Sequence, residues 1–174
     1  MQARAAEKVY HAGMPSGLRP PRLLVACAAL ALSCYSSRSH VQREGDYQFS
    51  TTEILSDPCG IGSGGARTWA GLLQMNGDDV RLLMDSGLFS AQSFNLQLNG
   101  YFLSELEQFR LDGSGANLTV LANGADCLVN LVQVHLDAIT RSPQAFGGTT
   151  QVSYKNRNGA CLCELQARYA AAMQ

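Results

Sequence analysis

Basic residues are scarce in this sequence beyond its first 39 residues. Residues 40–174 contain eight arginines and lysines against thirteen aspartates and glutamates, which gives a net charge of −5. Binding to nucleic acid depends on clustered Lys and Arg side chains that neutralise phosphates. The one local basic pair, Lys155 and Arg157, is interpreted as part of a solvated turn. We therefore do not expect a nucleic acid as a partner.

Histidine is also scarce, because His135 is the only one after residue 40. With no Gly-x-Ser-x-Gly elbow, a Ser-His-Asp or Cys-His site is not predicted, and a histidine-based metal site lacks ligands. The glycine-rich stretch 60–65 (GIGSGG) lacks the lysine of a phosphate-binding loop. Asp78 and Asp79 are interpreted as solvated turn charges, with a weak calcium site as the alternative. No cofactor is expected.

Long hydrophobic runs are limited to one, Leu23–Tyr35 (LLVACAALALSCY), which follows Arg19 and Arg22 and precedes several serines. A basic segment, a short apolar core and small residues after it are typical of a secretory signal peptide. The run is shorter than the ~20 residues that a membrane-spanning helix needs. The sequence therefore predicts an upstream extension and signal peptide over 1–39, and a single secreted domain over 40–174 without stable membrane insertion.

Four cysteines remain in the predicted domain: Cys59, Cys127, Cys161 and Cys163. An even number of cysteines on an oxidising route favours disulfides over a metal site. If Cys161 and Cys163 lie on one strand, their side chains point the same way, about 7 Å apart, and do not pair with each other. Two patterns stay open: 59–161 with 127–163, or 59–163 with 127–161.

Short runs that alternate apolar and polar residues predict an all-β fold. In SFNLQLNGYF, for example, Phe94, Leu96 and Leu98 share one face. Alternation with a period of two, punctuated by turns, is typical of an antiparallel sandwich or barrel, here of about eight or nine strands. The predicted turns are Asn76-Gly77, Asn99-Gly100, Asp112-Gly113, Asn123-Gly124 and Asn158-Gly159.

The predicted strands differ in how clearly the sequence marks them. Residues 126–139 also show near-helical spacing, but their valines and the preceding turn favour a strand. Residues 169–174, which include three alanines, are expected to form a short helix. The strands are predicted near 46–54, 68–75, 79–85, 93–98, 101–111, 117–122, 127–138, 149–154 and 160–168.

The stretch GLLQMNGDDVRLLMDSGLFSAQSF contains Asp85-Ser86-Gly87 at the end of a predicted strand. Over this one hairpin the sequence resembles retropepsin-like aspartic proteases, and LANGADCL (residues 121–128) is loosely similar to a later stretch of that family. The resemblance implies a dimer in which two copies of Asp85 share a proton and activate water.

The preferred interpretation of the same tripeptide is a turn. Asp and Ser side chains bond their own backbone in turns, and Gly accepts positive φ. Leu88 also stands where the protease family has a small residue, and only 39 positions separate Asp85 from Gly124, which leaves little chain for a flap. The residues therefore predict no catalytic site, with Asp85 as the alternative.

Asn117-Leu118-Thr119 is the one Asn-x-Ser/Thr sequon, and it follows a predicted turn. On a secretory route Asn117 is a candidate for glycosylation, with an unmodified loop residue as the alternative. Together these observations indicate a secreted extracellular binding domain without catalytic activity. Its partner is expected to be an extracellular protein or a small ligand. The alternatives are the retropepsin-like protease and a structural component of a matrix or coat.

We predict that residues 1 to about 39 are absent from the mature protein, because the arginine-flanked apolar run directs export and cleavage between Ser33 and Ser39. N-terminal sequencing of exported material checks this. A product that begins upstream of Leu23 would contradict it.

Overall fold

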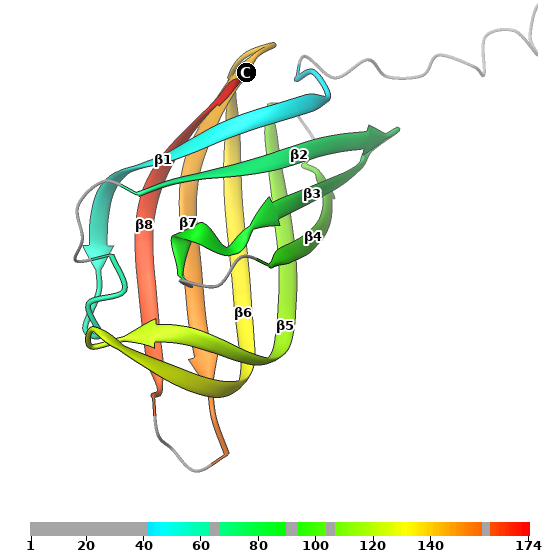
Figure 1. The fold of residues 1–174 in the computed structure, drawn as a ribbon. Coiled ribbons are helices and arrows are strands. Elements are labelled where there is room, and N and C mark those ends of the chain that lie inside the picture. The colour runs from blue at the N-terminus through cyan, green and yellow to red at the C-terminus, as the bar shows by residue number, and fades with distance from the viewer. Residues whose placement is uncertain (1–41, 63–66, 90–93, 104–106, 158–160) are drawn as a thin grey trace, which may run out of the picture. The chain divides into compact units, whose positions relative to one another are not determined.

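The computed structural model describes residues 42–62, 67–89, 94–103, 107–157 and 161–174, so the predicted signal peptide lies outside the described residues. The described residues form a closed antiparallel barrel in which β1 pairs with β8 (Figure 1), so the predicted all-β fold is confirmed as a barrel. Among them, no helix is long and apolar enough to cross a membrane. The elements are β1 (Gly45–Ser56), β2 (Thr68–Asn76), β3 (Asp79–Asp85), η1 (Ser86–Leu88), β4 (Asn95–Phe102), β5 (Gln108–Ala122), β6 (Ala125–Ser142), β7 (Ala145–Lys155) and β8 (Cys163–Met173).

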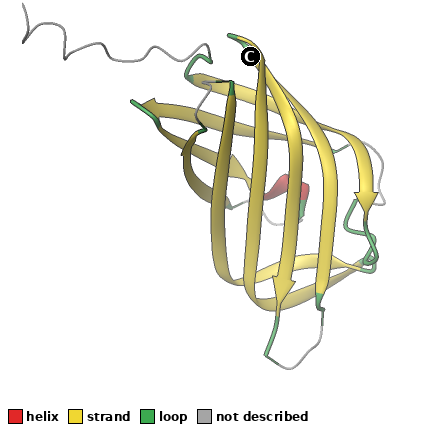
Figure 2. Cartoon of the chain, turned by 180° about the vertical axis from the view of Figure 1, so that it is seen from behind, coloured by secondary structure: helices red, strands yellow, loops and turns green. Residues whose placement is uncertain are grey.

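Alternation in the sequence becomes alternation between the inside and the outside of the barrel. On β3, Val80, Leu82 and Met84 are buried, while Arg81 and Leu83 between them are exposed. Successive side chains of a strand point to opposite faces, so a period of two fills one face with apolar groups. Strands β5 to β8 run side by side, and β1 to β4 cross them at a steep angle (Figure 1); Figure 2 shows β5 to β8 from behind.

Aromatic side chains fill much of the interior. The ring of Phe49 lies 5.2 Å from that of Trp69, 5.6 Å from that of Phe146 and 5.8 Å from that of Tyr169. Phe146 also contacts Phe109, at 5.1 Å between ring centroids. These five rings come from β1, β2, β5, β7 and β8, and each is almost fully buried. Contacts between aromatic rings stabilise a core by more than the burial of their apolar area alone provides.

Two of the predicted turns are wrong. Asn99-Gly100 lies inside β4 and Asp112-Gly113 lies inside β5. At both positions the glycine permits a close approach of neighbouring strands. A Cβ atom on Gly100 would lie 1.7 Å from the carbonyl oxygen of Arg110, and one on Gly113 would lie 2.6 Å from that of Gln97. Any larger residue would push the strands apart.

The turn at Asn123-Gly124 is present and connects the longest hairpin, β5–β6. Both residues have positive φ, of 53° and 74°, as a tight two-residue hairpin turn requires. The segment predicted at 101–111 is divided between the end of β4 and the start of β5, and the segment predicted at 117–122 lies in β5, so the barrel has eight strands, within the predicted eight or nine. The strand predicted over 127–138 is confirmed within β6.

The helix expected at the C-terminus is also wrong, because β8 continues to Met173. Tyr169 and Ala171 point inward, and Ala170 and Ala172 point outward. Small side chains fit here because the neighbouring interior is occupied by large rings: Ala171 pairs with Phe49 on one side and with Phe146 on the other. Packing against the sheet overrides the helix propensity of alanine.

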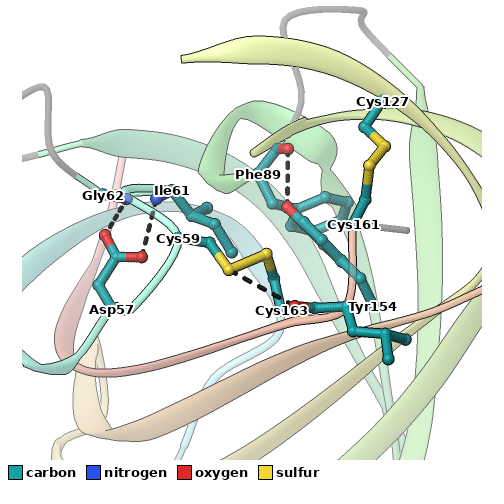
Figure 3. The surroundings of a disulfide bond; sticks show 10 residues. Asp57, Cys59, Ile61, Gly62, Phe89, Cys127, Tyr154, Cys161 and Cys163 are labelled. Carbon is teal, nitrogen blue, oxygen red and sulfur yellow. Dashed lines mark hydrogen bonds between the residues drawn. A yellow bond between two sulfur atoms is a disulfide. The ribbon is translucent and has the colours of Figure 1, made fainter. Parts of the chain in front are cut away.

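Two disulfides are present, Cys59–Cys163 and Cys127–Cys161, which is one of the two patterns that the sequence left open. Figure 3 shows both, and they are joined through the chain segment that carries Cys161 and Cys163 at the start of β8. The expectation that Cys161 and Cys163 lie on one strand is partly wrong. Cys163 begins β8, but Cys161 precedes it and has a φ of 56°. Cys59 and Cys163 are each 8% exposed, whereas Cys127 and Cys161 are only half-buried.

We predict that the two disulfides contribute unequally to the stability of the folded protein. Their sequence separations are 104 and 34 residues, and the chain-entropy estimate is roughly 4–5 kcal/mol for the longer loop and about 3–4 kcal/mol for the shorter. The double variant Cys59→Ser/Cys163→Ser should therefore unfold at a lower denaturant concentration than Cys127→Ser/Cys161→Ser. Urea titration compares the two double variants.

Peptide mapping of the unreduced wild type checks the pairing itself, even if a variant does not fold. A Cys59–Cys161 bond would contradict the pairing described here.

Candidate functional site

Asp85 lies at the end of β3, where its carboxylate accepts hydrogen bonds from the backbone. One oxygen accepts from the N–H of Gly87 at 2.8 Å and the other from the N–H of Ala70 at 3.1 Å. Asp85 is thereby the N-cap of η1. The contact with Gly87 is the one expected of the turn interpretation, whereas the contact with Ala70 joins Asp85 to the neighbouring strand β2, and Gly87 does not have the positive φ that the interpretation allowed for.

The interior of the barrel also holds tyrosines whose hydroxyl groups are bonded. Tyr154 donates to the carbonyl oxygen of Phe89 at 3.1 Å (Figure 3), and Tyr169 donates to that of Asp137 at 3.1 Å. Burial raises the pKa of both phenols, so they stay neutral donors. The hydroxyl groups at these two positions are therefore already bonded within the fold.

Outward-facing polar side chains line up across seven strands. Each register pair joins one member to the next, from Gln74↔Arg81 on β2 and β3 to Gln151↔Gln166 on β7 and β8. Directly opposed residues on one face of a sheet lie within contact distance of each other. The alignment thus makes one continuous row, here called the polar row. Its members are Gln74, Arg81, Asn99, Asp112, His135, Gln151 and Gln166.

His135, the neighbour of Asp112 in this row, lies between two carboxylates. Its Nδ1 is 2.7 Å from Oδ1 of Asp112, and its Nε2 is 3.2 Å from Oδ2 of Asp137. Arg110 donates from Nε to the other oxygen of Asp137 at 2.9 Å. His135 faces outward from β6, and its side chain is one-third exposed.

The charge of Asp137 depends on these neighbours. Partial burial opposes its ionisation, but the hydrogen bonds from Arg110 and His135 outweigh burial and lower the pKa of the carboxyl group. In turn, the hydrogen bond to Asp137 raises the pKa of the Arg110 guanidinium. Asp137 and Arg110 therefore stay charged and paired. Asp137, together with Asp112, fixes the orientation of the His135 imidazole ring.

Two hollows lie along the polar row and share Asn99. One, of about 790 Å³, lies beside the β2–β3 hairpin, where Leu72 and Met75 contribute apolar surface. The other, of about 730 Å³, extends from β4 to β8 and is here called the polar hollow. Gln97 donates to Asn99 at 2.8 Å and fixes its amide at the border of the two. The polar hollow is lined by Gln97, Asn99, Asp112, Gly113, Ser114, Gln133, Val134, His135, Gln151, Ser153, Lys155 and Glu164.

Of the other residues singled out by the sequence, Lys155 ends β7 instead of lying in a turn and lines the polar hollow, and Asp79 lines the first hollow. Asn117 is exposed on β5 with a φ of 54°. It has no register partner on β6, since the pairing goes from Ala116↔Leu131 to Leu118↔Val129. Asp78 lies in the β2–β3 turn and Asp79 begins β3. Residues 63–66 of the glycine-rich stretch and the Asn158-Gly159 pair lie outside the described residues. Among the residues that the structure describes, no group of three or more His, Cys, Asp or Glu side chains is arranged to hold a metal ion.

Comparison with known proteins gives no relative from which a site could be transferred. No protein-family model matches the chain, and no curated protein matches it. The polar hollow was not predicted from the sequence, because its members are scattered from residue 97 to residue 164. Only the pairing register brings them together.

We predict that Asp137→Asn lowers the free energy of unfolding by about 0.5–1 kcal/mol at neutral pH, the range of a well-formed surface ion pair. Because the folded pKa of Asp137 lies below the unfolded value of ~3.9, its contribution is present above that value. It is lost as pH falls through the folded pKa, so the wild type and the variant should converge in acid. Urea titrations across this range test it, with Asp126→Asn on the same strand as control. A difference that does not change with pH would contradict it.

Proposed function

We propose that this chain is an exported, non-catalytic binding domain, and that the polar hollow is its binding surface. Export is supported by the two disulfides, which persist in oxidising compartments and are rare in cytosolic proteins. The arginine-flanked apolar run near the N-terminus supports the same route.

The observation that carries the proposal is that four consecutive members of the polar row line the same hollow on the outer wall. Asn99, Asp112, His135 and Gln151 are consecutive members of the polar row, and all four line the hollow. They stand on paired strands of a cross-linked barrel, so their backbone positions are fixed before a ligand arrives. A preformed set of convergent polar groups favours binding because little conformational entropy is lost.

The retropepsin-like alternative receives less support from the geometry. Its mechanism needs a carboxylate that faces substrate and activates water, whereas both oxygens of Asp85 accept hydrogen bonds from Gly87 and Ala70. No comparable observation favours a role as a matrix or coat component. A binding domain remains the function that the described residues support best.

The test blocks the hollow without altering the core. Ser153 faces outward on β7 and lines the hollow, so Ser153→Trp should fill it and abolish binding. Ser50→Trp, on an outward and similarly half-buried serine of β1, is the matched control. The exported protein is tested against immobilised oligosaccharides, gelatin and phosphatidylcholine vesicles, with circular dichroism to monitor folding. The expected result is that at least one probe binds the wild type and the control but not Ser153→Trp. Wild type that binds none of them, or equal binding by all three proteins, would overturn the proposal.

A further inference from the structure

We infer that the ligand of the polar hollow is a neutral oligosaccharide. This inference rests on the proposed binding function and adds the chemical class of the ligand. It follows from three properties of the surface: the kind of polar groups, their charge balance and an exposed aromatic ring beside them.

The polar groups of the hollow are mainly amides and hydroxyls. Gln97, Asn99, Gln133 and Gln151 each offer a donor and an acceptor, and Ser114 and Ser153 offer hydroxyl groups. A sugar hydroxyl also donates and accepts at once, so a row of amides can pair with successive hydroxyls and leave none unsatisfied. Gln133 is exposed on β6 between Ser114 and Ser153, its register partners on β5 and β7. It is therefore available for such a contact.

The charges around the hollow nearly cancel. Lys155 is the one lysine or arginine that lines it, against Asp112 and Glu164. Asp112 is in contact with His135, and the nearby Arg110 is paired with Asp137. Phosphate or sulfate recognition relies on several free Arg or Lys donors, which this surface does not offer. The charge balance thus favours a ligand without net charge.

Tyr101 supplies an exposed aromatic ring on β4, two residues from Asn99 and outside the set of residues that line the hollow. Its side chain is 52% exposed, and it is the one aromatic residue in the exposed class among the described residues. It faces outward two residues after Asn99 on β4, on the same side of the strand. An aromatic face carries partial negative charge and attracts the weakly positive C–H groups of a sugar ring. An exposed ring next to a set of amides therefore suits a sugar, which has an apolar face and a polar edge.

An extended peptide is less well matched to this surface. Peptides that bind to sheets commonly add a strand to a free edge through backbone hydrogen bonds. The strands β6 and β7, which contribute half of the hollow's lining residues, are paired on both sides in the closed barrel. Side-chain contacts alone remain, and these are polar and suited to hydroxyl groups.

The experiment measures binding of neutral oligosaccharides, namely fragments of cellulose, mannan and chitin, to the full exported protein by glycan array and calorimetry. Gln133→Ala and Tyr101→Ala should each weaken binding by about tenfold, the loss of one good contact. Gln108→Ala, an exposed outward glutamine on β5 outside the hollow, is the control and should bind like the wild type. Binding should also be unchanged between low and high salt, because the ligand is neutral.

The outcomes separate this inference from the proposed function. If gelatin or vesicles bind and Ser153→Trp blocks them while no oligosaccharide binds, the hollow is a binding surface but the carbohydrate inference is wrong. If an oligosaccharide binds and Gln133→Ala and Tyr101→Ala behave like Gln108→Ala, the inference is also wrong. Binding that is lost at high salt would identify an anionic ligand and overturn it as well.

Discussion

The barrel depends on the pairing of its first strand with its last. Phe49 on β1 sits at this closure and contacts rings from β2, β7 and β8, so one side chain links the two ends of the chain to the core. Closure also leaves β1 and β8 without the free edges that an open sheet presents to other chains. The outer wall, including the polar hollow, has its regular register because the strands beneath it are held on both sides.

How far the sequence predicts this fold depends on what each residue pattern reports. Apolar alternation predicts the strands because it reflects the two faces of a sheet. Glycine is ambiguous, since it serves both turns and close approach: Asn123-Gly124 is a turn, whereas Gly100 and Gly113 lie inside strands where neighbouring backbones approach. The alanines of β8 were misread because their role is to leave space for Phe49 and Phe146, a property of the packed interior and not of the local sequence.

The candidate site is less predictable than the fold. His135 and Asp112 are 23 residues apart, and their contact depends on the register of the whole β5–β6 hairpin. A shift of one residue would turn every side chain of a strand to the opposite face. The sequence marks the turn at Asn123-Gly124 that sets this register, but it does not mark which polar residues on β4, β7 and β8 join them. Asp85 shows the converse. The tripeptide Asp85-Ser86-Gly87 is easily recognised in the sequence, but in the fold Asp85 caps the short helix η1 that Ser86 and Gly87 begin.

Closure by the terminal strands also determines the order in which this chain can fold. Hairpins such as β5–β6 are local and can form early, whereas the β1–β8 ladder must wait for residues more than a hundred positions away. Structures with many such distant contacts fold slowly. Cys163 lies 104 residues after Cys59, so the Cys59–Cys163 bond cannot form until the start of β8 has been synthesised. The barrel therefore remains open until its last strand is available to pair with β1 and β7.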